Sequence, residues 1–196
     1  MATSSRRGFS LTETAIVLGV AGLILSGVWV MVGGMRSSAI QTKFSDLLAV
    51  VVENIRGTYV GKASFESTSP TKMMPILRRK HVFPGDVVRK ESDGTIKVVS
   101  PFGGELVVCG WKASGSTKCE TAGETLDVPF FAVEIAVDKK DCINAVVRNA
   151  NSSLFPGLLG VYINGTKREL PISFSAAQTG CSKASNIVDF VFRLLP

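Results

Sequence analysis

An uncharged apolar segment near the amino terminus constrains the fold more than any other feature of this sequence. It runs from Ala15 to Met35 without one charged residue. As an α-helix rising about 1.5 Å per residue, a segment of this length can cross a bilayer core of about 30 Å. Arg6 and Arg7 precede the segment and Arg36 follows it, which favours a cytoplasmic amino terminus. The sequence therefore predicts a helix whose first half spans a membrane.

The helix is predicted to continue beyond the apolar segment as an amphipathic half. Apolar residues recur on one helical face at Ile40, Phe44, Leu47, Leu48, Val51 and Ile55. No proline interrupts the chain between Met1 and Ser69. We therefore expect one helix from about Ser10 to Thr58, and the apolar stripe of its second half requires a covering surface from the rest of the chain.

Composition restricts the classes of function. Hydrophobic residues make up 45% of the 196 residues and charged residues 19%, which excludes a disordered chain and suits one domain plus an extra element. The net charge of +6 permits contact with nucleic acid, but no motif supports it. His81 is the single histidine, which excludes a multi-histidine metal site. No hydrolase, metalloprotease or dinucleotide motif occurs, so we expect no enzyme, no metal and no cofactor.

Residues 61–196 are predicted to form a β-rich head, which makes the fold class α+β with an antiparallel sheet. Asp93-Gly94 and Asn164-Gly165 are hairpin-turn dipeptides between apolar runs. Apolar residues alternate with others from Phe131 to Val137, which predicts a half-buried strand. A similar alternation from Val188 to Leu194 predicts the last strand.

Two further segments of the head have weaker signals. The segment from Asp138 to Asn149 is predicted to be a helix, with Asp138 or Asp141 as its N-cap. The segment from Gly61 to Pro84 is interrupted by prolines and serines and is predicted to be a loop. It ends in the basic cluster Arg78-Arg79-Lys80-His81, which is predicted to be a solvated part of that loop.

The four cysteines allow three disulfide pairings, among which the sequence does not choose. Proximity favours Cys109 with Cys119, which leaves Cys142 with Cys181. Two disulfides would place the head in an oxidising compartment. A zinc site is not expected, because no CxxC spacing occurs.

The heptapeptide Arg7-Gly8-Phe9-Ser10-Leu11-Thr12-Glu13, followed by the apolar segment, resembles the processing site of type IV pilins and related pseudopilins. The resemblance implies that a prepilin peptidase cuts between Gly8 and Phe9 and methylates the amine of Phe9. Glu13 then becomes the fifth residue of the mature chain, where the family has a glutamate that acts in assembly.

The resemblance also implies a domain organisation and the pilin fold. Residues 1–8 would be the leader peptide, and residues 9–60 the long helix, with 9–35 in the membrane and later in the filament core. Residues 61–196 would be the head. Within it, a disulfide between Cys142 and Cys181 would bound the variable region of the family, residues 142–181.

The function implied is that of a structural subunit that polymerises with copies of itself into a type IV pilus for adhesion, DNA transfer or motility. Its partners would be prepilin peptidase and the assembly machinery of the bacterial inner membrane. The precursor would lie in that membrane, and the mature subunit in an extracellular pilus.

The subclass stays open at the level of sequence. Phe102-Gly103-Gly104 before a strand, Lys140-Asp141-Cys142 after one, and a late Cys181 are similar to PilS-like class b pilins. The short leader and Phe9 are instead typical of class a.

Two alternatives also stay open. The first is a minor pilin or a type II secretion pseudopilin. The second is a membrane-anchored periplasmic binding protein exported by a twin-arginine signal, because Ser5-Arg6-Arg7 fits such a signal.

Overall fold

The computed structural model describes residues 11–62, 64–65, 69–112, 119, 128–151 and 153–194, without the side chains of residues 28–36. It divides into two compact units, Met1–Ala39 and Ile40–Pro196. The leader and the predicted cleavage site, residues 1–9, lie outside the described residues.

The long helix α1 (Leu11–Thr58) has 48 residues and confirms the predicted continuous helix. Every described side chain from Leu11 to Gly27 is exposed. Among the described residues, no helix combines the length and apolarity that crossing a bilayer requires. The predicted membrane-spanning half therefore stays a prediction.

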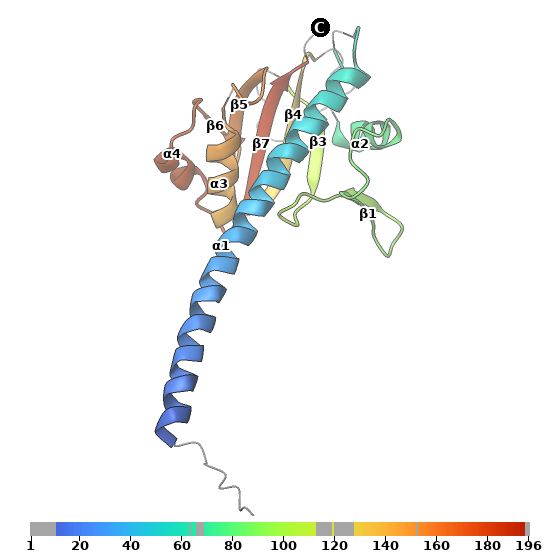
Figure 1. Ribbon diagram of the computed structural model, residues 1–196. Coiled ribbons are helices and arrows are strands. Elements are labelled where there is room, and N and C mark those ends of the chain that lie inside the picture. The colour runs from blue at the N-terminus through green and yellow to red at the C-terminus, as the bar shows by residue number, and fades with distance from the viewer. Residues whose placement is uncertain are drawn as a thin grey trace, which may run out of the picture. The chain divides into compact units, whose positions relative to one another are not determined.

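The second unit is built on a five-stranded antiparallel sheet with the strand order β3-β4-β7-β5-β6, which confirms the α+β class (Figure 1). The strands are β3 (Leu106–Gly110), β4 (Phe130–Asp138), β5 (Leu158–Ile163), β6 (Thr166–Arg168) and β7 (Ser185–Arg193). A separate hairpin pairs β1 (Val88–Lys90) with β2 (Ile96–Val98).

Both predicted hairpin turns are confirmed. Gly94 lies between β1 and β2 with φ of 85°, a conformation that glycine adopts without steric cost. Asn164 and Gly165, with φ of 53° and 82°, join β5 to β6. Positive φ at both central residues is the requirement of a type I′ turn, which Asn-Gly meets best.

The amphipathic half of α1 packs its apolar stripe against one face of the sheet. Phe44, Leu48, Val51 and Ile55 are fully buried. The Phe44 ring centroid lies 5.0 Å from that of Phe102, before β3, and 5.8 Å from that of Phe190 on β7. Such tilted aromatic contacts add to the hydrophobic burial that holds the helix on the head.

The prediction of a loop from Gly61 to Pro84 is wrong, because α2 (Pro70–Arg79) lies within it. Pro70 stands at the first helical position, where its missing N–H would have no intrahelical partner anyway. Met73 and Leu77, one turn apart, are buried. Pro75 lies inside the helix, where a proline removes a backbone hydrogen bond, so the burial of this apolar face overrides a helix-breaking signal.

The helix predicted from Asp138 is confirmed as α3 (Lys139–Asn149). Asp138 is the N-cap, and its carboxylate accepts a hydrogen bond of 2.8 Å from the Asp141 backbone N–H. A short helix that the sequence did not predict, α4 (Phe174–Gly180), follows β6 and is capped by Ser173.

Strand β4 differs from the prediction of a half-buried strand, because its second face is covered as well. Ala132 and Glu134 on that face are buried. A second, smaller apolar cluster covers part of this face, and it consists of Cys109, Trp111, Cys119, Ala132 and Val191. The alternation in the sequence correctly predicted that successive side chains of the strand point to opposite faces. The burial of its second face depends on a disulfide and a tryptophan from the neighbouring segment.

Candidate functional site

Glu13, the predicted assembly residue, lies in the first turn of α1 with an exposed side chain. A carboxylate there interacts favourably with the partial positive charge of the helix N-terminus. Its predicted partner in processing, Phe9, lies outside the described residues, so the structure does not bring the two together.

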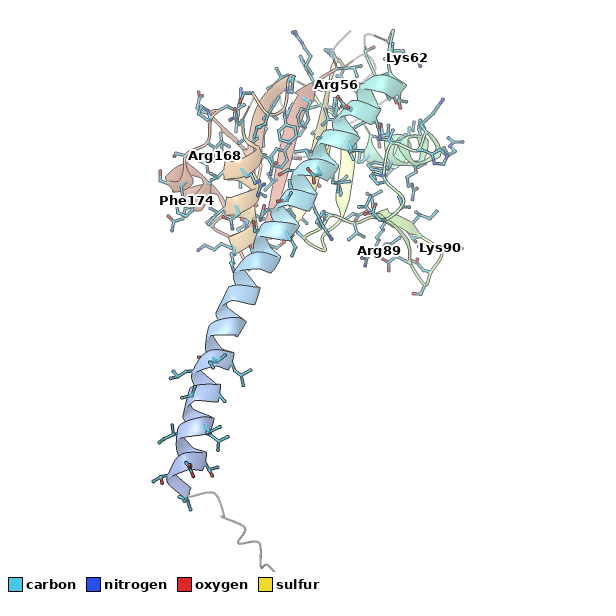
Figure 2. The ribbon with its side chains drawn as sticks, viewed as in Figure 1. Arg56, Lys62, Arg89, Lys90, Arg168 and Phe174 are labelled. Carbon is cyan, nitrogen blue, oxygen red and sulfur yellow. A yellow bond between two sulfur atoms is a disulfide. The ribbon has the colours of Figure 1, made fainter. Side chains whose placement is uncertain are left out.

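The first turns of α1 carry large apolar side chains in contact with solvent. Leu11 is 88% exposed, Leu23 75% and Leu18 67%. Figure 2 shows the side chains of this blue end of α1 projecting outward around the helix. We call residues 11–27 the N-terminal apolar segment. Contiguous exposed apolar surface of this kind marks a site of contact with protein or lipid.

Two disulfides stabilise the head. Cys109 is bonded to Cys119, and Cys142 to Cys181, with sequence separations of 10 and 39 residues. All four cysteines are buried. In the loop-entropy model, closing loops of these lengths contributes roughly 3 and 4 kcal/mol. The longer loop holds most of α3 together with β5, β6 and α4.

An asparagine network fixes the end of this disulfide-bounded segment. The Asn164 side-chain amide donates to the Gly180 backbone carbonyl at 3.1 Å and to Asn186 Oδ1 at 2.9 Å. Asn186 is fully buried and accepts from the Lys183 backbone N–H at 3.2 Å. The β5–β6 turn is therefore tied to the residues around Cys181, which sequence spacing alone did not reveal.

Arg56, near the end of α1, clamps the helix to two carbonyls of the head. Its Nη2 donates to the Pro156 carbonyl at 2.6 Å and to the Arg193 carbonyl at 3.2 Å. Partial burial lowers the pKa of the Arg56 guanidinium below its usual value, while Glu53 opposes the shift. An isolated arginine on a predicted helix gave no signal of this role.

A second contact joins α1 to the start of α3. Gln41 Nε2 lies 3.5 Å from the Asp141 backbone carbonyl as a weak donor. Burial raises the pKa of the Asp141 carboxyl, and the neighbouring charge of Asp138 adds to the shift. This junction places an acidic pair beside the amphipathic half of α1.

A group with potential metal ligands lies on the second face of the sheet. Cys119, Glu134 and Asp189 bring their ligand atoms within 4.8 Å of one another. Cys119 is oxidised in a disulfide, so its sulfur is no thiolate ligand. Glu134 accepts a hydrogen bond of 3.1 Å from the Cys119 backbone N–H. The geometry thus serves the disulfide loop and gives no support to a metal site.

Comparisons with known proteins agree with the architecture. No family model matches the chain. The chain is 27% identical, over 179 residues, to the major structural subunit of the bundle-forming pilus of Escherichia coli O127:H6 (strain E2348/69 / EPEC). The alignment covers 91% of this chain and 82% of that protein.

The fold is similar to the crystal structure of a type IV b pilin from Salmonella typhi, with a TM-score of 0.55 and 20% sequence identity. The match covers 76% of this chain and 96% of the pilin chain. The chain therefore has the type IV pilin fold. The alignment over most of both sequences and the shared fold are thus two separate similarities to pilus subunits.

Proposed function

We propose that this chain is a structural subunit that polymerises with copies of itself into a type IV pilus at the cell surface. The observation that carries the proposal is the N-terminal apolar segment of α1, whose large side chains are exposed while the same helix is packed into the head further along. Beyond Glu13 this segment has no charged residue on any side, so its apolar surface requires an apolar partner.

Packing against identical helices would bury this segment. Burial of apolar surface contributes about 25 cal/mol per Å², so several leucines and isoleucines per subunit provide a large driving force for association. Ala15 and Gly19 are four residues apart, as are Gly22 and Ser26, and small residues at this spacing let helices approach closely.

Processing is part of the proposal. Prepilin peptidase would cut between Gly8 and Phe9 of a precursor in the bacterial inner membrane and methylate the new amine of Phe9. The pilus assembly machinery of that membrane would then move the mature subunit from the bilayer into the filament. The motif around Gly8 and the glutamate at Glu13 support this order of events.

Two similarities favour a major pilin of class b. The relative found by sequence is a major structural subunit, and the solved structure with the same fold is a type IV b pilin. The Phe102-Gly103-Gly104 motif agrees with class b, whereas Phe9 does not.

Glu13 provides the sharpest test of the assembly role. Removal of the leader creates a positive amine at Phe9, and a buried charge in a helix bundle requires an opposite charge. We expect Glu13→Ala to be cleaved normally but to give few or no fibres. The measurement is the mass of the membrane-bound subunit together with the yield of sheared fibres.

Asp46→Ala is the matched control, because Asp46 is an exposed carboxylate on the same helix but within the head unit. It should assemble like the wild type. A wild-type fibre yield from Glu13→Ala would refute the assembly role of this carboxylate.

A further inference from the structure

Asn164-Gly165, the β5–β6 turn, is the one Asn-Gly dipeptide of the sequence. Asparagine before glycine is prone to spontaneous deamidation, because glycine has no side chain to hinder attack by its own backbone nitrogen. In this reaction the Gly165 nitrogen attacks Cγ of Asn164, a C–N bond forms, and the bond from Cγ to Nδ2 breaks. The N–H proton leaves with the departing ammonia. Water then opens the five-membered succinimide ring, which leaves aspartate or isoaspartate at position 164.

The conformation of the folded turn opposes the first step. Asn164 has φ of 53° and Gly165 has φ of 82°, as a type I′ turn requires. In the left-handed region ψ is about +30 to +60°. Ring closure instead requires a strongly negative ψ, which brings the Gly165 nitrogen and the Asn164 Cβ to the same side of the Cα–C bond. The turn therefore holds the attacking nitrogen away from Cγ.

Hydrogen bonds hold the Asn164 side chain as well. Its Nδ2 donates to the Gly180 carbonyl at 3.1 Å and to Asn186 Oδ1 at 2.9 Å, and its Oδ1 accepts from the Ile187 backbone N–H at 3.2 Å. Asn186 is itself fixed, since it is fully buried and its Nδ2 donates to the Lys183 carbonyl at 2.8 Å. Rotation of the Asn164 amide toward the turn nitrogen would break all three of its hydrogen bonds. The fold thus protects both reacting groups.

This protection depends on a part of the sheet that opens at low cost. β6 is the outermost strand and pairs with β5 through three residue pairs (Figure 1). Short edge elements open locally more often than the core of a domain. Asn164 and Gly165 are half-buried, so water reaches the turn. Gly180 precedes Cys181, and the disulfide of Cys181 to Cys142 therefore restrains one of the acceptors that hold Asn164.

We propose that Asn164 is a deamidation site that the fold holds inactive, and that opening of the disulfide-bounded segment 142–181 starts an irreversible modification there. The product does not restore the closed arrangement. A carboxylate has no proton to donate to the Gly180 carbonyl or to Asn186 Oδ1, so acceptor oxygens face acceptor oxygens. Isoaspartate also adds a methylene to the backbone of a two-residue turn, whose length fixes the strand register. The modification therefore accumulates in subunits whose head has opened and prevents them from closing correctly.

The first test measures the rate of deamidation in the full chain. The oxidised protein in detergent is kept in mildly alkaline buffer below its melting temperature, beside the same chain reduced and denatured in urea. Mass spectrometry of the peptide that contains residues 164–165 follows the conversion of the amide to a carboxyl group. The folded chain should react roughly tenfold or more slowly than the denatured chain. Equal rates in the two states would overturn the proposal.

Asn186→Ala tests whether the network is responsible for the protection. It removes one acceptor from Asn164 Nδ2, and the loss of one hydrogen bond shifts the opening equilibrium by up to roughly tenfold. Deamidation should therefore be up to about tenfold faster than in the folded wild type. Asn186→Ser, which keeps a hydroxyl beside Lys183 but ends one atom short of the Asn164 amide, repeats the test if Asn186→Ala does not fold.

Leu48→Ala is the matched control, because it removes a fully buried side chain of α1 that shares no hydrogen bond with the network. It should change the deamidation rate by less than about twofold, since sites without shared partners act independently. Circular dichroism melts verify that each variant is folded under the conditions of the assay. An acceleration in Leu48→Ala equal to that in the Asn186 variants would show that general unfolding controls the reaction and would contradict the proposal.

The last test concerns the product. Asn164→Asp carries the carboxylate of the deamidated chain, and Asn164→Gly is its matched control, because glycine accepts the positive φ and has no charge. Asn164→Asp should melt about 5 °C or more below the wild type, and Asn164→Gly should lose less. A melting temperature of Asn164→Asp at or above that of Asn164→Gly would show that the carboxylate fits the network and would refute the proposed irreversibility. None of these measurements depends on polymerisation, so this proposal and the proposed pilus function can fail separately.

Discussion

One helix meets two different environments in this protein. In the first unit, the described side chains of α1 from Leu11 to Gly27 are all exposed, although most are apolar. In the second unit, the same helix buries Phe44, Leu48 and Ile55 completely against the sheet. One continuous helix therefore has an exposed apolar part and a part that packs into the head.

The difference lies in how the apolar residues are distributed around the helix. Beyond Ile40, charged residues such as Lys43, Asp46 and Glu53 occupy the face opposite the apolar stripe, so one face suffices for the head. From Ala15 to Met35 no charged face exists. A helix that is apolar on all sides is stable only where something surrounds it. Contacts within the chain thus explain how the second half of α1 buries its apolar stripe. Contacts with other molecules must cover the apolar surface of the first half.

The largest expected effect separates the two halves by matched truncations. Leu48→Ala removes a fully buried side chain and should lower the free energy of unfolding of the head by about 2–5 kcal/mol. Leu23→Ala removes a leucine that is 75% exposed and should change the free energy of unfolding by less than about 0.5 kcal/mol. Its effect should appear instead as a loss of fibres. Denaturant unfolding and fibre yield are measured for both variants. Equal destabilisation of the head by Leu23→Ala and Leu48→Ala would contradict this comparison.

A smaller effect is confined to the head and should leave the N-terminal half of α1 unaffected. A Cβ added at Gly104 would lie 2.0 Å from the Ala136 carbonyl oxygen. This oxygen belongs to the backbone of β4, which cannot move away at low energetic cost. Gly104→Ala should therefore destabilise the head by about 3 kcal/mol through overpacking. Gly85→Ala is the control, since nothing lies within 4 Å of the added atom. Equal unfolding midpoints for the two variants would show that β3 and β4 are not packed as described.

The smallest effect concerns the junction of α1 with α3. Because burial raises the pKa of Asp141, ionisation of this carboxyl is less favourable in the folded state than in the unfolded state. The folded state binds this proton more readily than the unfolded state, so the penalty disappears as the pH falls through the raised pKa.

Asp141→Asn should then slightly raise the melting temperature at neutral pH, and the difference should vanish under acid conditions. Asp46→Asn, at an exposed carboxyl of α1, serves as the control for net charge. Thermal melts across this pH range measure both. A melting temperature that falls in Asp141→Asn at neutral pH would show that the ionised carboxyl stabilises the junction.

The sequence predicted those elements whose signal is local. Periodicity predicted α1, and the dipeptides Asp93-Gly94 and Asn164-Gly165 predicted two hairpins. Asp138, one of the two predicted N-caps, is the one that begins α3. In each case, the residues that determine the backbone conformation lie within the element itself. Local rules suffice there because tertiary contacts reinforce them.

Elements stabilised by distant contacts were missed. The prolines in α2 favoured a loop, but burial of Met73 and Leu77 beside β3 holds the helix. The Met74 sulfur even accepts a hydrogen bond of 3.2 Å from the Val108 backbone N–H. The Arg56 clamp and the Asn164–Asn186 network were missed for the same reason, since their partners lie far away in sequence. For the candidate site, Gly8 and Phe9 stay predictions because they precede the described residues.

The most direct test of the account is the mass and amino-terminal sequence of the mature subunit purified from sheared surface filaments. A pilin that assembles through its first helix must lose its leader before the apolar segment can enter a filament. We predict a chain that begins with N-methylated Phe9 and contains both disulfides. A chain that retains Met1 would not have been cut at Gly8, and a chain cut beyond Met35 would lack the proposed assembly segment. Either result would contradict the proposed assembly.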